Sequence, residues 1–262
     1  MHITSNERIM AYGGTGCGKS DGWLSIAEVC QDDMFYCIDT DKAIKRMLDT
    51  EYAHLKNVKV VDCRSWETFE KAIERIGELI KDRPGDWIIV DMIDALWSFV
   101  TNWYTQKVFG KDYDEYMLQV RQAVKDKDPK KLETLKGWTD WNVINPTYQD
   151  AVNKMFYEFD CNIYVTAKSV QYNSSSDDKE YSDMKEMFAS IGLKPEGEKR
   201  NPNRTHTVLF LNNDFDGYYI TTIKDRGRPK LRHFKYSSDT NRHKLIDVYG
   251  KIITKQEVKE ID

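Results

Sequence analysis

The sequence has no apolar run that approaches the roughly 20 residues a helix needs to cross a membrane. Residues 1–7 lack the apolar core of a secretory signal peptide. The five cysteines (17, 30, 37, 63 and 161) have no metal-ligand spacing, and their odd number argues against a disulfide framework. These absences predict a cytoplasmic protein, in the host cytoplasm if the source is viral, with reduced thiols and no membrane partner.

The sequence also lacks an internal repeat and a clear interdomain linker. With 262 residues, 40% hydrophobic and 31% charged, it can form one large α/β domain over 1–262. The formal net charge is −4, because 39 Lys and Arg residues face 43 Asp and Glu residues. Any contact with nucleic acid must therefore come from a local basic patch.

The most specific motif lies near the N-terminus and consists of Gly13, Gly14, Thr15, Gly16, Cys17, Gly18, Lys19 and Ser20. This is G-x-x-x-x-G-K-[ST], the Walker A loop, whose glycines let backbone N–H groups surround a phosphate. An apolar strand, Arg8–Tyr12, precedes the loop and a helix, Asp21–Cys30, follows it. This context argues against the alternative, a glycine-rich turn that matches by chance, and predicts a nucleotide site. Lys19 contacts the β- and γ-phosphates and the Ser20 hydroxyl binds Mg²⁺.

A second site element is the carboxylate that ends an apolar strand at Asp86–Asp91. Continuous apolar character is typical of a strand buried on both faces of a parallel sheet. Ligands bind where the carboxyl ends of such strands meet, so Asp91 is the Walker B candidate for holding Mg²⁺ directly or through water. The alternative is an ordinary carboxylate closing a strand.

Further strands are predicted over Met34–Ile38, Val58–Asp62 and Cys161–Thr166, with helices over 42–52 and 65–82 between them. The last of these strands presents Thr166 and Lys168 as candidates to face the γ-phosphate. Between the Walker B strand and this strand lies a helical segment rich in Trp and Tyr, an insertion over about 93–145. A helix is expected from Pro146 to Phe159. The aromatic residues of this Trp- and Tyr-rich part of the chain either pack on the sheet or stack on nucleic-acid bases.

The C-terminal part is predicted to contain a polar, mobile loop over about 169–205 with a short helix at 184–191. Strands follow at Thr207–Leu211, Tyr218–Ile223 and Arg232–Tyr236, and the turn-rich residues 212–217 make the first two an antiparallel hairpin.

The order of the elements resembles that of RecA-like P-loop ATPases. The elements are the P-loop, an acidic end to the second strand, the Walker B carboxylate, a polar end to the fifth strand and a terminal hairpin. More closely, the chain looks like the compact phage ATPases of the Sak type, which assist single-strand annealing and recombination. The resemblance implies a mostly parallel central sheet flanked by helices, with a C-terminal antiparallel β-hairpin. It also implies ATP and Mg²⁺ as cofactors and single-stranded DNA and further copies of the chain as partners.

Two local matches suggest catalytic residues. Residues 38–41, Ile-Asp-Thr-Asp, are similar to the I-D-A-E of RecA-like recombinases, which makes Asp41 the candidate to orient the attacking water. Because Asp41 is one methylene shorter than glutamate, Asp39 is the alternative base. Residues 224–227, Lys-Asp-Arg-Gly, are similar to the K-x-R-x-G of hexameric helicases. Lys224 and Arg226 would then reach the γ-phosphate of a neighbouring subunit; otherwise they form a solvated basic turn.

The leading hypothesis is thus an ATPase that acts on DNA as an oligomer with shared sites. The sequence leaves three alternatives open: a packaging or translocation motor, a nucleotide-dependent switch with little turnover, and a small-molecule kinase. Arg200 and Arg204 are the lid arginines that a kinase would use.

Overall fold

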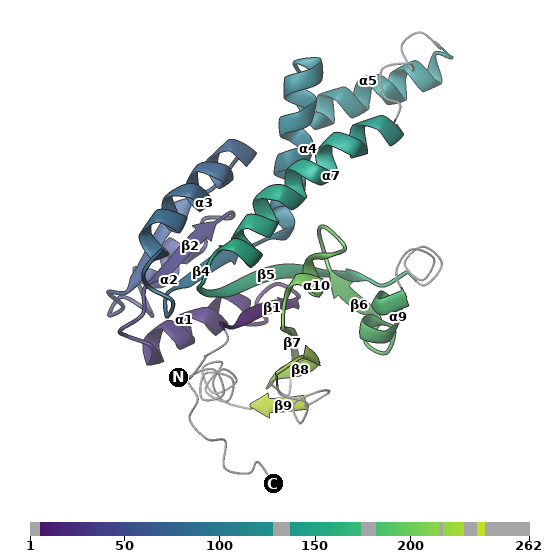
Figure 1. The fold of residues 1–262 in the computed structure, drawn as a ribbon. Coiled ribbons are helices and arrows are strands. Elements are labelled where there is room, and N and C mark those ends of the chain that lie inside the picture. The colour runs from purple at the N-terminus through teal and green to yellow at the C-terminus, as the bar shows by residue number, and fades with distance from the viewer. Residues whose placement is uncertain (1–5, 128–136, 174–181, 215–216, 228–234, 239–262) are drawn as a thin grey trace.

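The computed structural model of the chain describes residues 6–127, 137–173, 182–214, 217–227 and 235–238 (Figure 1). Its centre is a sheet in the order β3-β2-β4-β5-β1-β7-β8-β9. The strands from β3 to β7 in this order are parallel, and β8 runs antiparallel to both β7 and β9. The carboxyl ends of the parallel strands therefore meet at one edge of the sheet, where the P-loop lies.

The first four strands begin and end within one residue of their predicted bounds. The strands predicted at 161–166, 207–211 and 218–223 extend further, and one short strand was not predicted. The strands are β1 (Arg8–Gly13), β2 (Phe35–Asp39), β3 (Val58–Asp62), β4 (Trp87–Asp91), β5 (Asn162–Gln171), β6 (Leu193–Pro195, paired with β5), β7 (Thr207–Asp214), β8 (Gly217–Asp225) and β9 (Lys235–Ser238). Every residue of β2 and β4 is buried, as their continuous apolar character predicts. The β7–β8 pairing confirms the C-terminal hairpin.

Helices cover both faces of this sheet. They are α1 (Lys19–Val29), α2 (Ile44–Leu48), α3 (Trp66–Ile80), α4 (Asp94–Phe109), α5 (Tyr113–Lys125), α7 (Gly137–Asn153), the π-helical turn η1 (Lys154–Glu158), α9 (Ser182–Phe188) and α10 (Asn201–Arg204). One core layer joins the sheet to α3, α4 and α7, and the other joins it to α1 and the segment around α2. The helices α4, α5 and α7 extend beyond the sheet as an arm (Figure 1).

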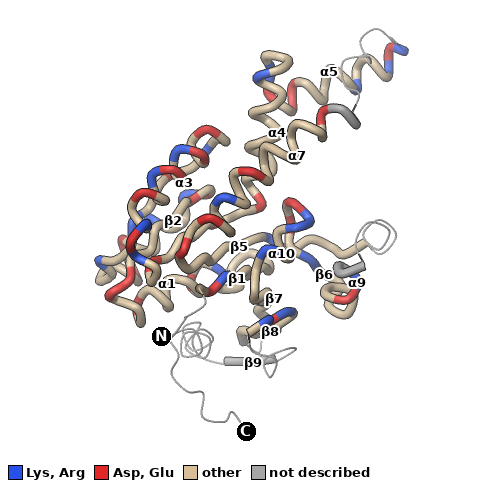
Figure 2. Tube along the Cα trace, in the orientation of Figure 1, with Lys and Arg blue, Asp and Glu red and all other residues tan. Residues whose placement is uncertain are grey.

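Helix α3 shows how local sequence and packing agree. Ser65 caps its first turn, because the Ser65 side chain accepts a hydrogen bond from the Thr68 N–H at 3.2 Å. Its buried residues recur every three to four positions and face the core. The exposed side carries charges of both signs along its length (Figure 2). Within the described residues, no helix is long and apolar enough to cross a bilayer.

Three expectations need correction. The helix expected at 42–52 is only the short α2. The helix expected to begin at Pro146 begins at Gly137 and runs through that proline. Pro146 is exposed, so water can solvate the carbonyl that its ring leaves unbonded, while Ile144 and Tyr148 hold the buried face of α7. Over 169–205 the described residues are more regular than a loop, since they hold the end of β5, α9, β6 and α10.

The aromatic residues of the arm pack on one another and on α3. Tyr148 is fully buried and stacks on Trp66, with ring centroids 6.0 Å apart. Trp97 and Trp141 stack at 5.7 Å, although Trp141 stays 39% exposed. Core packing therefore explains Tyr148, in agreement with the first of the two interpretations. Pro129, which was expected to separate two helices of the insertion, and the side chain of Trp138 lie outside the described residues.

Candidate functional site

The P-loop connects the carboxyl end of β1 to the first turn of α1. Gly16 and Gly18 have φ angles of +75° and +89°, a region that side chains with a Cβ rarely adopt. A Cβ on Gly13 would lie 2.0 Å from the carbonyl oxygen of Leu211 on β7, so the loop begins in close contact with the neighbouring strand. The backbone thus needs glycine at these positions to form the cradle that the sequence predicts.

Lys19, the first residue of α1, points back into this loop. Its Nζ donates hydrogen bonds to the carbonyl oxygens of Gly14 (2.6 Å) and Gly13 (3.1 Å), and the side chain is buried. An ammonium group held over the loop at a helix N-terminus creates a positive site for a phosphate. Lys19 therefore lies where its predicted role requires.

The Asp91 carboxylate is the central anion of the site. Its Oδ1 accepts a hydrogen bond from the Thr166 hydroxyl at 2.5 Å, and its Oδ2 accepts one from Trp23 Nε1 at 3.1 Å. Burial raises the pKa of Asp91, and the hydrogen bonds from Thr166, Ser20 and Trp23 oppose that shift. The carboxylate at the end of β4 is thus held by Thr166 of the neighbouring strand β5 and by Ser20 and Trp23 of α1.

The residues around Asp91 fit a Mg²⁺ ion. Mg²⁺ prefers hard oxygen ligands and commonly takes one or two protein oxygens together with water and substrate phosphates. Ser20 and Asp91 supply those oxygens beside the phosphate cradle. In the described part of the chain no group of three or more His, Cys, Asp or Glu residues could hold a metal by itself. The donor set therefore suits an ion that arrives with a nucleotide.

We expect Asp91→Asn to preserve nucleotide binding and to lower Mg²⁺-dependent hydrolysis by about 100-fold or more. The change keeps the size of the side chain but removes the charge that attracts the ion. Mg²⁺ titrations of hydrolysis by the two proteins measure this effect. Identical titration curves and rates would mean that Asp91 only ends a strand.

Trp23 is a site residue that the sequence interpretation missed. It is fully buried and stacks on Phe35, which in turn stacks on Trp87. Because the indole N–H donates to Asp91, Trp23 holds the carboxylate in place. A lone tryptophan in a helix indicates core packing, so the sequence carried no sign of this contact.

We expect Trp23→Phe to destabilise the protein by about 1–3 kcal/mol more than Trp87→Phe does. Both changes replace a buried indole that packs on Phe35 with the smaller phenyl ring. Only the first also leaves a buried carboxylate oxygen without its donor. The Trp87 Nε1 is buried without a hydrogen-bond partner among the described residues. Urea unfolding of the two variants measures the difference, and equal losses would show that the indole contact contributes nothing.

The two candidate bases differ in their surroundings. Asp39 is fully buried, and its oxygens accept hydrogen bonds from the N–H groups of Asp41 (3.1 Å), Lys42 (2.8 Å) and Ile44 (3.2 Å). It therefore organises the turn before α2, which argues against its use as a base. Asp41 is exposed, and its Oδ1 accepts from the Ala43 N–H at 3.0 Å. Asp41 remains the better candidate of the two.

Thr40, between these carboxylates, links their turn to the Walker B strand. Its N–H donates to the Asp91 carbonyl at 2.7 Å, and its hydroxyl accepts from the Met92 N–H at 2.7 Å. The Arg64 guanidinium donates to the Thr40 carbonyl. The turn that carries Asp41 is thus fixed to the strand that carries Asp91.

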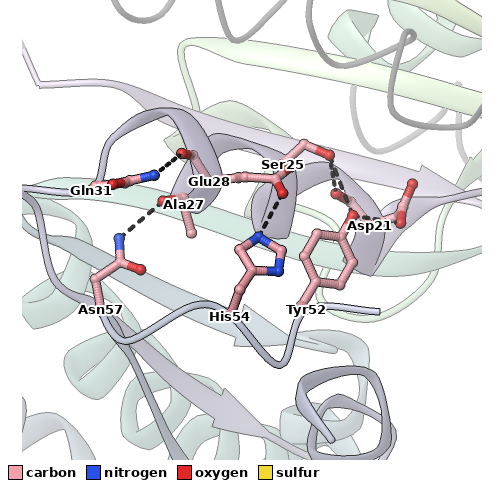
Figure 3. Close-up of polar contacts among 8 residues, drawn as sticks. All are labelled: Asp21, Ser25, Ala27, Glu28, Gln31, Tyr52, His54 and Asn57. Atoms are coloured by element: carbon pink, nitrogen blue, oxygen red, sulfur yellow. Dashed lines mark hydrogen bonds and ion pairs between the residues drawn. The ribbon is translucent and has the colours of Figure 1, made fainter. Parts of the chain in front are cut away.

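The P-loop helix is held in place by the segment that follows α2 (Figure 3). The Tyr52 hydroxyl donates to Asp21 Oδ1 at 2.7 Å, and His54 Nε2 lies 2.6 Å from Glu28 Oε1. Asn57 Nδ2 donates to the Ala27 carbonyl at 3.0 Å. These contacts run along α1 and keep its N-terminus directed at the loop.

Thr166 and Lys168, the two residues predicted to face the γ-phosphate, lie in the middle of β5, where it passes the carboxyl end of β4. Thr166 is buried against Asp91, so it positions the carboxylate and does not face a ligand directly. Lys168 is exposed and stands in register with Gly13 of the P-loop. The Lys168 N–H donates to Asp94 Oδ1 at 3.3 Å. Lys168 is therefore the cation of this strand that lies beside the phosphate cradle.

Lys224 and Arg226, the two cations of the K-x-R motif, have different surroundings. Lys224 is buried, and its Nζ donates to the carbonyls of Thr205 (2.6 Å) and Pro202 (2.8 Å). Here the ammonium group is bound by carbonyls around residues 202–205 and not by a phosphate, which argues against a contact of Lys224 with a neighbouring subunit. Arg226 is exposed just beyond β8. It lies at the amino edge of the sheet, since Asp225 pairs with Thr207 at the start of β7.

A second predicted contact cation is also internal. Arg204, a lid arginine in the kinase alternative, has a side chain that is only 6% exposed and pairs with Glu198 at 2.6 Å. Its Nε also donates to Asn153 Oδ1 at 2.9 Å. A buried cation of this kind is stable because it is paired and hydrogen-bonded, so its charge is already matched within the chain.

No family model and no curated protein matches the sequence. The solved structures that resemble the chain include one described as the crystal structure of the RadB recombinase. It has a TM-score of 0.51 and 10% sequence identity, and the match covers 91% of this chain and 90% of that chain. At this identity the likeness concerns the fold, so the predicted RecA-like architecture, with its parallel sheet and C-terminal hairpin, is confirmed.

Proposed function

We propose that the chain is a Mg²⁺-dependent ATPase that acts on DNA, in single-strand annealing, recombination or replication support. The observation that carries this proposal is the convergence of Ser20, Asp91 and Thr166 beside the cradle of Lys19. The recombinase of similar fold supports the DNA-related part of the proposal. Assembly as a homo-oligomer with shared sites, and a role like that of the phage Sak-type ATPases, are further parts of it.

Each side chain of the candidate site has its own role in hydrolysis. Lys19 binds the β- and γ-phosphates, and Ser20 with Asp91 would hold Mg²⁺, which neutralises phosphate charge when it is bound. Thr166 and Trp23 fix the Asp91 carboxylate from two sides. Asp41, on the turn fixed to the Walker B strand, is the residue that orients the attacking water.

One observation favours a second candidate, a nucleotide-dependent switch with little turnover. The Asp41 carboxylate is short and accepts a hydrogen bond from its own turn, and Asp39 is fully used by backbone N–H groups. A chain with no well-placed base would bind ATP and hydrolyse it slowly. The kinase alternative is weakened because Arg204, one of its two lid arginines, is buried.

Hydrolysis of ATP with and without single-stranded DNA tests the proposal. Stimulation by DNA supports a DNA-dependent ATPase or a translocation motor, and movement along DNA would identify the motor. ATP binding without turnover would identify the switch, and transfer of phosphate to a metabolite would identify a kinase. The last two results contradict the leading proposal.

We expect three basic residues before β7, Lys194, Lys199 and Arg200, to contact single-stranded DNA. Replacing all three with glutamine should weaken binding and reduce the slope of log affinity against log salt by about 2, at roughly 0.7 per phosphate contact. Arg204→Gln is the control, because this arginine is internal and its loss should lower stability without changing the slope. An unchanged salt slope in the triple variant would place DNA elsewhere.

A further inference from the structure

The arm of α4, α5 and α7 (Figure 1) and the turn before α3 border a hollow of about 590 Å³. We call it the arm hollow. Two carboxylates line it, those of Asp112 and Asp114. Its walls also include four aromatic side chains, which are Trp97, Phe99, Tyr113 and Trp141. A volume of this size is typical of a ligand site, and these residues are distinct from those of the nucleotide site.

The indoles of the arm hollow form a fixed stack with one exposed member. Trp97 and Trp141 lie parallel, with 5.7 Å between ring centroids and 4° between ring planes. The inner indole, Trp97, also packs edge-on against the buried ring of Tyr148 at 5.3 Å. Trp141 is 39% exposed and Tyr113 is 36% exposed. Because the stack is held from behind, Trp141 presents an ordered aromatic surface whose contact with a ligand costs little side-chain entropy.

The carboxylates of Asp112 and Asp114 give the arm hollow negative charge. Both residues are exposed, and within the described part of the chain neither forms an ion pair. Asp112 Oδ1 accepts a hydrogen bond from Gln106 Nε2 at 2.5 Å, but this neutral donor leaves the charge of the carboxylate in place. A cationic ligand would therefore meet two carboxylates that have no ion-pair partner of their own.

Arg64 is the one cation among the described residues that line the arm hollow. Its guanidinium donates to the Thr40 carbonyl, so it is held by the turn that carries Asp41. With two carboxylates and one guanidinium, the lining has a formal charge of −1. Arg64 thus weakens the attraction of the hollow for a cation without reversing it.

A second hollow, of about 650 Å³ between α3 and α7, separates the effect of charge from that of aromatic surface. Five carboxylates, including Glu74 and Asp150, and two lysines line it, but among the described residues no aromatic side chain does. The phosphates of a nucleic acid would meet negative charge at both hollows. A cation would be attracted by both, and in the arm hollow it would also contact indole rings, whose faces are electron-rich. The arm hollow therefore favours a cation over a nucleic acid.

We propose that the arm hollow binds an arginine side chain of a partner protein, presented on a basic peptide segment. A guanidinium stacks on indole faces, and tryptophan is the aromatic residue that attracts cations most strongly. The same planar group donates paired hydrogen bonds to a carboxylate, which Asp112 and Asp114 supply in the same hollow. The proposal does not depend on the proposed ATPase activity, because its residues lie outside the P-loop and the Walker B strand.

Isothermal titration calorimetry of the whole chain without nucleotide tests this proposal. The probe is a synthetic peptide with three arginines separated by glycines. The comparison peptide carries citrulline, a neutral side chain of nearly the same shape, and should bind about tenfold more weakly or less tightly still. Trp141→Ala should lower the affinity for the arginine peptide by about tenfold or more. Val143→Ala, at an exposed position of the same helix outside the hollow, should not change it.

Charge variants separate the arm hollow from the second hollow. The double variant Asp112→Asn and Asp114→Asn should weaken binding by about tenfold. Asparagine preserves the start of α5, because it is also a favoured N-cap residue. Glu74→Gln with Asp150→Asn removes the same charge from the second hollow and should have little effect at about 0.15 M salt, where distant charges are screened. Arg64→Gln should strengthen binding by about threefold, since it removes the opposing cation.

Three results would overturn the proposal: no binding of the arginine peptide, equal binding of the two peptides, or undiminished binding in folded Trp141→Ala. A single-stranded oligonucleotide of thymidines tests the other class of ligand. Oligonucleotide binding that Trp141→Ala abolishes would identify the hollow as a base-stacking site and contradict the proposal. If Trp141→Ala does not fold, the double variant of Asp112 and Asp114 decides, and an unchanged affinity for the arginine peptide rejects the proposed site.

Discussion

Lys19→Ala is expected to weaken ATP binding by about 100-fold or more and to reduce hydrolysis below detection. The Lys19 ammonium is held over the carbonyls of Gly13 and Gly14, at the place where the β- and γ-phosphates would lie. A charge-assisted hydrogen bond contributes about 1.5–3 kcal/mol, and a 100-fold change in affinity corresponds to about 2.7 kcal/mol. Equilibrium binding of a fluorescent ATP analogue, together with a phosphate-release assay, measures both effects.

Lys45→Ala is the matched control for this change, because Lys45 is an exposed lysine on α2, outside the P-loop. It should bind and hydrolyse ATP like the wild type. Far-ultraviolet circular dichroism must show that both variants are folded. Undiminished affinity and turnover in folded Lys19→Ala would mean that the nucleotide is not bound at the P-loop.

Arg226→Ala is expected to keep ATP binding and to lose most hydrolysis, on the order of 10³-fold, as for an arginine finger that acts on a neighbouring subunit. The structure puts this exposed side chain at the amino edge of the sheet. The P-loop of the same chain follows the opposite end of β1, so Arg226 cannot contact its own γ-phosphate without a large rearrangement. Arg121→Ala, at an exposed position on α5, should leave turnover unchanged.

Mixed assemblies decide whether Arg226 acts between subunits. Neither Arg226→Ala nor Lys19→Ala should hydrolyse ATP alone. In a mixture, an Arg226→Ala subunit can offer its intact P-loop to a Lys19→Ala neighbour that still has the arginine, so partial activity should return. If mixtures stay inactive while the wild type is active at dilutions where it is monomeric, Arg226 acts within its own chain or not at all.

The sequence alone was enough to predict the phosphate cradle and most of the sheet. The P-loop needs glycine at positions with positive φ and a lysine at the start of the following helix, and both requirements fall within eight consecutive residues. Strand β4 could be predicted because burial on both faces requires apolar residues throughout, and its last residue, Asp91, had to lie at the edge where ligands bind.

Only the tertiary structure decided which of the charged residues remain available to a ligand. Lys224 and Arg226 are two residues apart, yet the first is bound by carbonyls from around residues 202–205 and the second is exposed. Arg204 resembles its neighbour Arg200 in sequence, but its partners include Asn153, 51 residues away. A side chain's partner across such a distance leaves no periodic pattern, because it depends on how strands and helices pack and not on local spacing. For the same physical reason the Trp23 contact with Asp91 emerges only once α1 is packed against the sheet.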